Sequence, residues 1–213
     1  MKSRQNYAFA SVVIIVFCLI VWWVVLIKQG NMPYIDQWTR SFVDRIANTS
    51  AYTFFRYVTE LGSKSFVQPF TIMMSLIIWF MYRDFRPAFI FGFGVLGTHI
   101  LNKLLKEMVA RERPSISATL NAEGYSFPSG HSMVSIVCYG LLAYFVGMQL
   151  RSNIAQFIAY LSLAILILLI GVSRYIINVH YLTDIIAGYT FGGILLFYLM
   201  KLYKQLELKR KKT

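Results

Sequence analysis

The chain has 213 residues, of which 57% are hydrophobic and only 14% are charged. Soluble domains carry about 25% charged and about 45–50% apolar residues, so this composition excludes an ordinary soluble enzyme. The formal net charge of +12 lies between apolar runs and in the tail Lys209-Arg210-Lys211-Lys212, not on one face of a polar fold. This distribution argues against nucleic acid as a partner and favours a membrane with anionic head groups.

The first apolar run, at residues 7–27, follows Lys2 and Arg4, as the core of a signal peptide would. It is longer than such a core, and no small-x-small cleavage site follows it. We therefore expect a retained first transmembrane helix. Cys18 in this run and Cys138 in a later one are interpreted as buried apolar residues, not as a disulfide.

Residues 32–65 form a long connector after the first run. Within it, apolar residues recur at helical spacing with charged residues between them: Ile35, Trp38, Phe42 and Ile46 against Asp36, Arg40 and Asp44. The pattern predicts an amphipathic helical segment that lies on the outer membrane surface. Two interpretations stay open for this segment, namely a plain connector and a lid or lipid guide over a site.

Six apolar segments have no charge through their middle, and a helix needs roughly 20 apolar residues to cross a bilayer. They lie at residues 7–27, 66–82, 87–105, 131–149, 154–172 and 184–201. Helices are expected because lipid cannot satisfy an open backbone, and the alternation of barrel strands is absent from the sequence. We predict an all-α polytopic membrane protein with one membrane-embedded domain over residues 1–213.

The connectors between these segments differ in charge. If the N-terminus is cytoplasmic, the inner connectors carry Lys and Arg opposed only by Asp84 and Glu207, whereas the outer ones mix both signs. The positive-inside rule then predicts that both termini lie in the cytoplasm. We expect a multi-pass protein of the cell membrane whose remaining connectors face outward.

Three polar clusters interrupt the apolar chain, and all three fall on the predicted outer side. They are Lys106-x6-Arg113-Pro114, Pro128-Ser129-Gly130-His131 and Ser173-Arg174-x5-His180-x3-Asp184. Connectors on one side of a helical bundle converge, so the clusters are expected to share one pocket.

The three cations of these clusters indicate an anion site. Lys106, Arg113 and Arg174 would repel one another near one point unless an anion such as a dianionic phosphate neutralised them. Arginine also forks across two phosphate oxygens, which lysine does not. Lys106 and Arg113 are seven residues apart, so a helix that Pro114 ends would carry both on one face.

The second cluster is typical of a turn that leads into a helix, whose first N–H groups bind anions. Gly130 allows close backbone approach, the Ser129 hydroxyl adds a donor, and His131 would exchange a proton at the rim. In the third cluster, His180 and Asp184 are four residues apart and would meet on one helix face. A carboxylate on one ring nitrogen leaves the other nitrogen free to attack.

In order and spacing, the three clusters resemble the signature of the type-2 phosphatidic acid phosphatase superfamily, over residues 106–184. Within it, the chain is similar to bacterial membrane phosphatidylglycerophosphate phosphatases. The resemblance implies that His180 attacks phosphorus to form a phosphohistidine and that Asp184 orients it. His131 would protonate the leaving alcohol and then activate water. It further implies that no metal or other cofactor takes part and that the phosphoryl oxygens are held by Lys106, Arg113, Ser129, Gly130 and Arg174.

The resemblance favours phosphatidylglycerophosphate as the substrate and leaves undecaprenyl diphosphate and phosphatidic acid open. A transporter or flippase would explain the cations, but not His131 or the pair of His180 and Asp184. A metal-dependent hydrolase would have to recruit acidic residues whose spacing fits no common ligand set, namely Glu107, Glu112, Glu123 and Asp184. His99, inside an apolar segment, is interpreted as structural, and the sequence indicates no oligomeric state.

Overall fold

The computed structural model describes residues 2–46, 49–114 and 124–210. Helices make up most of these residues, and the described ranges contain no strand. The eight helices of these ranges are α1 (Lys2–Lys28), α2 (Tyr34–Ile46), α3 (Ser50–Glu60), α4 (Lys64–Tyr82), α5 (Phe85–Val109), α6 (Gly130–Gly147), α7 (Asn153–Ile176) and α8 (Leu182–Arg210). The predicted all-α fold is therefore confirmed.

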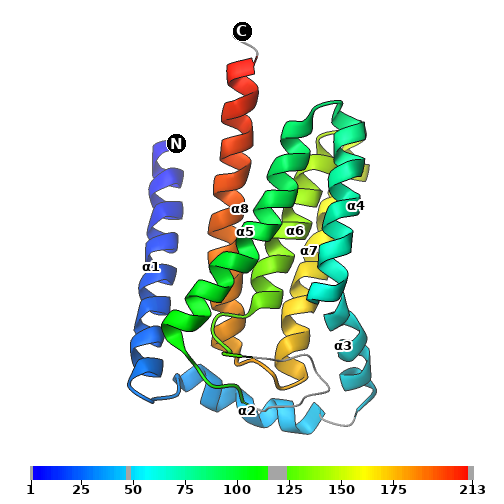
Figure 1. The fold of residues 1–213 in the computed structure, drawn as a ribbon. Coiled ribbons are helices and arrows are strands. Elements are labelled where there is room, and N and C mark those ends of the chain that lie inside the picture. Colours follow the sequence, from blue (N-terminus) through cyan, green and yellow to red (C-terminus); the bar gives the residue numbers. More distant parts are fainter. Residues whose placement is uncertain (1, 47–48, 115–123, 211–213) are drawn as a thin grey trace.

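Five of these helices, α4 to α8, are long and apolar enough to cross a membrane. They coincide with the second to sixth predicted segments. The first predicted segment lies in α1, where the part with described side chains contributes a shorter apolar stretch, Ile14–Lys28. The protein is thus a multi-pass membrane protein. Both ends of the chain lie at one end of the bundle, and α2 lies across the opposite end (Figure 1).

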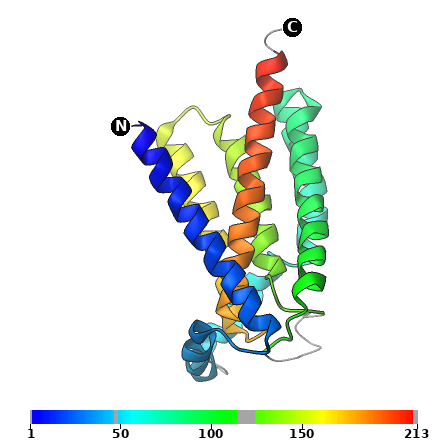
Figure 2. The ribbon, with the colours of Figure 1, turned by 90° about the vertical axis from the view of Figure 1, so that its left-hand side faces the viewer.

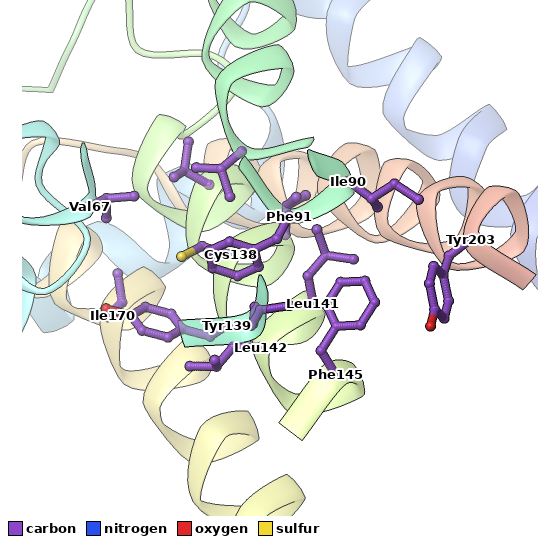
Figure 3. Close-up of a cluster of buried hydrophobic side chains, with 14 residues drawn as sticks. Val67, Ile90, Phe91, Cys138, Tyr139, Leu141, Leu142, Phe145, Ile170 and Tyr203 are labelled. Carbon is purple, nitrogen blue, oxygen red and sulfur yellow. The ribbon is translucent and has the colours of Figure 1, made fainter. Parts of the chain in front are cut away.

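Helix α6 is the centre of the bundle and packs against α5, α7 and α8. Its apolar side chains meet Phe91 of α5 and Ile170 of α7, both fully buried, in the main hydrophobic cluster (Figure 3). Phe145 of α6 and Tyr203 of α8 stack edge to face with ring centroids 5.1 Å apart. Because α6 is enclosed on several sides, its N-terminal turn is held firmly by its neighbours.

Helix α1 stands at the edge of the bundle. It is inclined to the other long helices (Figure 2), and within the described residues it packs mainly against α5 and α8. Ile20 and Trp23 are buried on its inner side, whereas Cys18 is exposed on its outer side. The prediction that both cysteines are buried is therefore correct for Cys138 and wrong for Cys18, because a peripheral helix has one face without protein neighbours.

The connector after α1 forms two helices, α2 and α3, and α2 is the amphipathic helix that the periodicity of this connector predicts. Trp38 and Phe42 are 71% and 53% exposed, which suits apolar side chains that face lipid at the membrane surface. Asp36, in contrast, is only 2% exposed. Although the amphipathic pattern sets Asp36 apart from the apolar residues, this carboxylate turns inward and meets buried partners.

Helix α5 ends earlier than the position of Pro114 predicts. Ala110 adopts a left-handed conformation with φ of 56°, and its N–H bonds the carbonyl of Lys106. The chain leaves the helix there, so Lys106 is helical while Arg113 lies in the following connector. The prediction of one helix through both residues is therefore wrong.

Candidate active site

The predicted site residues gather at the end of the bundle that α2 and α3 cover, opposite the two chain termini (Figure 1). They come from the last turns of α5 and α7, the first turns of α6 and α8, and the connectors between these helices: Lys106, Arg113, Ser129, Gly130, His131, Arg174, His180 and Asp184. Segments that are far apart in the sequence thus share one site.

The imidazole of His180 is held by Asp184. Nδ1 of His180 lies 3.3 Å from Oδ2 of Asp184, as the spacing of four residues predicts. His180 precedes α8, however, and does not lie on it. The same Oδ2 accepts the backbone N–H of Tyr181 at 2.9 Å, which ties the carboxylate to the start of the helix. With Nδ1 donating to the carboxylate, Nε2 carries the lone pair of the ring.

The charge state of His180 suits a nucleophile. Burial lowers the pKa of His180 well below its usual value, and the nearby cations Lys106, Arg113 and Arg174 lower it further. The imidazole is therefore neutral at neutral pH. Nη1 of Arg113 lies 3.1 Å from Nε2 of His180, so a guanidinium fork stands at the nitrogen that would attack.

Backbone carbonyl groups of the connectors before α6 and α8 orient two of the cations. Arg113 donates from Nε to the carbonyl of Gly124 at 2.9 Å and from Nη1 to that of Val179 at 2.8 Å. Lys106 donates from Nζ to the carbonyl of Tyr125. These carbonyl oxygens position the two cations at the site.

Arg174 is the most deeply buried of the cations, at 2% exposed. Its Nη1 donates to the hydroxyl of Thr59 on α3 at 3.0 Å. Its Nε is buried and has no hydrogen-bond partner among the described residues. A buried charged donor without a partner is costly, and a phosphate oxygen would satisfy it.

The second cluster forms the expected turn into α6. The Ser129 hydroxyl caps the helix by accepting the N–H of Ser132 at 3.4 Å, and the Ser129 N–H donates to the carbonyl of Asp184 at 2.9 Å. The bond to Asp184 ties the start of α6 to α8, and Ser129 is fully buried there. The first-turn N–H groups of Gly130 and His131 have no partner within the described ranges and are open to an anion.

His131 stands next to the turn between α3 and α4. A Cβ atom at Gly62 would lie 2.9 Å from Cδ2 of His131 and 2.5 Å from a methyl carbon of Ile170. Only glycine fits this contact. The charged and titratable groups around His131 are Lys106, Arg113, Arg174 and His180. His131 therefore lies where it can serve the same anion as the three cations.

The structure reveals functional neighbours that the motifs did not indicate. Asn102 donates to the carbonyl of Pro128 at 3.2 Å and so supports the turn before α6. Arg111 pairs with Asp184, although the motif of the first cluster contains Arg113 and not Arg111. No local pattern marks Arg111, which stands among other charged residues in the connector, and none marks Asn102 or Gly62.

The acidic residues of the metal-dependent alternative are engaged elsewhere. Glu107 lies 3.9 Å from Lys103 on the surface, Glu112 is exposed, and Asp184 pairs with Arg111 at 2.7 Å. Glu123 lies outside the described residues. Among the described residues, no three His, Cys, Asp or Glu side chains gather as metal ligands. His99 is half-buried in α5, and its Nε2 has no hydrogen-bond partner among the residues described.

Comparison with known families adds an independent observation. Residues 87–207 match the family described as the PAP2 superfamily, which is more than half of the chain and includes all three clusters. The chain belongs to the PAP2 superfamily. This confirms the resemblance that the three clusters predict.

Individual PAP2 relatives extend the comparison beyond the matched region. The chain is 34% identical over 146 residues to phosphatidylglycerophosphatase B of Bacillus subtilis, covering 68% of this chain and 70% of the relative. It is 25% identical over 162 residues to dolichyldiphosphatase of Saccharomyces cerevisiae, covering 71% and 68%. The crystal structure of a PAP2-type phosphatidylglycerolphosphate phosphatase from Bacillus subtilis superposes with a TM-score of 0.75 at 22% identity, over 88% of this chain and 96% of that one. The last likeness concerns the fold.

Proposed function

We propose that this membrane lipid phosphatase of the PAP2 superfamily, acting as one domain, hydrolyses the terminal phosphomonoester of phosphatidylglycerophosphate. The products are phosphatidylglycerol and inorganic phosphate. The observation that carries the proposal is a neutral, buried His180 whose Nε2 faces the guanidinium of Arg113. The relative of 34% identity, a phosphatidylglycerophosphatase, supports the choice of lipid.

The reaction follows from this geometry in two steps. Nε2 of His180 attacks phosphorus, and the bond from phosphorus to the lipid oxygen breaks as His131 donates a proton to that oxygen. His131 then removes a proton from water, which attacks the phosphohistidine and restores His180. Asp184 accepts the Nδ1 proton in a hydrogen bond throughout, so it stabilises the positive charge that forms on the ring.

Electrostatic stabilisation is the main contribution assigned to the other residues. Lys106, Arg113 and Arg174, with the N–H groups of Gly130 and His131, would hold the phosphoryl oxygens as negative charge shifts onto them. The free Nε of Arg174 is one donor that this role would use. Ser129 would contribute by fixing the α6 turn, and its hydroxyl hydrogen remains a further donor.

The same proposal places the site outside the cytoplasm. Both chain termini lie at the bundle end opposite the site, and the basic tail begins at that end (Figure 1). The positive-inside rule assigns this basic end to the cytoplasm of the cell membrane. Substrate would then be processed in the outer leaflet, under α2 and α3.

A polyprenyl diphosphate is the second candidate substrate. The similarity to a dolichyldiphosphatase favours it, because undecaprenyl diphosphate presents the same terminal phosphate on a long apolar chain. The cations and histidines at the site act on that phosphate alone, so they fit either lipid.

A phosphate-release panel tests the proposal. The purified chain is given phosphatidylglycerophosphate, undecaprenyl diphosphate and phosphatidic acid, alone and in competition, with His180→Ala as the control. We expect the highest kcat/KM with phosphatidylglycerophosphate and no release by the control. Preference for undecaprenyl diphosphate would support the second candidate, and equal release by His180→Ala would refute the assignment of the nucleophile.

A further inference from the structure

A buried ion network joins the membrane-surface helix α2 to the proposed catalytic pair. Nη2 of Arg111 lies 2.7 Å from Oδ2 of Asp36 on α2, and Nη1 lies 2.7 Å from Oδ1 of Asp184 on α8. The side chain of Arg111 is 7% exposed, and those of both aspartates are 0% exposed. The Arg111 guanidinium also lies 3.8 Å from the centre of the Tyr181 ring. One cation is therefore shared by two buried carboxylates.

The two oxygens of Asp184 have different partners. Oδ2 faces Nδ1 of His180 and the N–H of Tyr181, while Oδ1 faces Arg111. Rotation of the carboxylate about its Cβ–Cγ bond would break all of these contacts together. The contact with Arg111 thus helps to fix the plane in which the carboxylate meets the imidazole.

Asp36 holds Arg111 and the start of α8 at the same time. Its Oδ1 accepts the N–H of Thr183 at 3.0 Å, and its Oδ2 accepts the Thr183 hydroxyl at 2.6 Å. The Thr183 hydroxyl in turn accepts a hydrogen bond from Nη1 of Arg111 at 2.8 Å. A carboxylate at a helix N-terminus is favourable because it satisfies orphan N–H groups and the helix dipole. Helix α2 is therefore fastened directly to the residues that orient Asp184.

We propose that Arg111, held by Asp36, is a positioning residue that fixes the carboxylate of Asp184 against His180. The proposal rests on the roles given above to Asp184 and His180. It makes α2 a fixed wall of the catalytic centre, because its Asp36 is part of the network. A buried ion network of this kind often adds little to stability compared with apolar packing, so its contribution here is expected in the chemistry.

The network predicts opposite effects of neutralising its two outer members. Arg111→Met leaves two unpaired buried carboxylates, so Asp184 takes up a proton at higher pH and stops polarising His180. Asp36→Asn leaves Arg111 to Asp184 alone, so Asp184 stays ionised to lower pH. The other charged and titratable groups around His180 and Asp184 are unchanged in both variants. They are Lys106, Arg113, His131 and Arg174.

The test is the pH dependence of kcat for the full-length chain in detergent, with thermal unfolding measured on each variant. The acid limb of the profile reports protonation of the His180 and Asp184 pair. We expect it to move to higher pH in Arg111→Met and to lower pH in Asp36→Asn. At neutral pH, kcat of Arg111→Met should fall about 100-fold, the loss typical of a misplaced reacting group, with little change in KM.

The double variant, Arg111→Met with Asp36→Asn, supplies the decisive comparison. Asp36→Asn removes the negative charge that repels the Asp184 carboxylate once Arg111 is gone. The double variant should therefore recover part of the activity that Arg111→Met loses. Arg111→Lys keeps the charge but cannot fork to two carboxylates, so it should lower kcat and leave the acid limb in place. A merely structural tie between α2 and α8 would give losses that accumulate, with no movement of the limb.

Three results would overturn the proposal: shifts of both single variants in the same direction, no shift in either, or a double variant that is less active than Arg111→Met. If Arg111→Met does not fold, the near-isosteric Asp36→Asn carries the test through its own predicted shift. Asp184→Asn tests the role of Asp184 separately from the role of Arg111. If Asp184→Asn keeps full kcat, the proposed role of Asp184 fails; if it is impaired while the acid limbs do not move, only the role of Arg111 fails.

Discussion

The contact between Gly62 and His131 allows a sharp test of the general acid and base. In Gly62→Ala, the new methyl group would lie 2.5 Å from a methyl carbon of Ile170 and 2.9 Å from Cδ2 of His131. Carbon atoms in good contact are about 3.5–4.0 Å apart, so relief requires a displacement of roughly 1 Å. Ile170 is fully buried in the main hydrophobic cluster, and the carbonyl of Leu61 is bonded by the Tyr139 hydroxyl at 2.6 Å. Relief therefore requires both neighbours to give way, and His131 is displaced together with the methyl group of Ile170.

A shift of this size has a predictable kinetic signature. A misplacement of about 1 Å lowers a catalysed rate by roughly 100-fold. The loss should be large with a lipid substrate, whose alkoxide needs a proton from His131, and small for phosphoenzyme formation from a nitrophenyl phosphate, whose leaving group needs little protonation. Rapid-quench measurement of phosphoenzyme and steady-state phosphate release separate the two steps.

Gly97→Ala is the matched control, because a Cβ atom at Gly97 would meet nothing within 4 Å. This variant should keep wild-type rates with both substrates. Equal losses with the two substrates in Gly62→Ala would show that the substitution disturbs more than His131. Unchanged release of phosphate from the lipid would refute the assignment of His131 as the proton donor.

Three further predictions concern the nucleophile and the orientation of the chain. The two histidines should fail differently. His131→Ala should form phosphoenzyme from nitrophenyl phosphate in a burst and turn over slowly, whereas His180→Ala should form none. Phosphoryl label trapped on His180→Ala would contradict the assigned roles. Burial and nearby cations hold the pKa of His180 well below its usual value of about 6.5, so the ring stays neutral below that pH. The burst of phosphoenzyme should therefore persist below about pH 6.5. A loss of the burst with a midpoint near that pH would be the contrary result. In a cysteine-free background on intact cells, Arg45→Cys should react with a membrane-impermeant thiol reagent and Lys209→Cys should not, and the reverse pattern would invert the proposed topology.

Much of this protein was predictable from the sequence, because the relevant signals are local. Apolar runs of bilayer length identify the spans, since lipid leaves a helical backbone few alternatives. The amphipathic period of residues 34–46 predicts α2. Residue types at fixed spacing, such as His180 and Asp184, predict the type of reaction and the family to which the chain belongs. Their contact at 3.3 Å was predicted as well, but from one shared helix, whereas α8 starts only at Leu182 and His180 lies before it.

Tertiary structure alone decided which residues complete the site. Asp36 looks like a solvated helix residue, yet it bonds Arg111 across 75 residues and Thr183 across 147. Gly62 has no motif, yet it sets the space beside His131. The local end of α5 at Ala110 releases Arg111 toward α2 and α8, where Pro114 alone predicted a continuing helix. Periodicity indicates which residues of a segment face apolar and which face polar surroundings. A buried charge, however, is stable only beside a partner of opposite charge or a hydrogen-bonding group. The packing of helices that are distant in the sequence brings that partner.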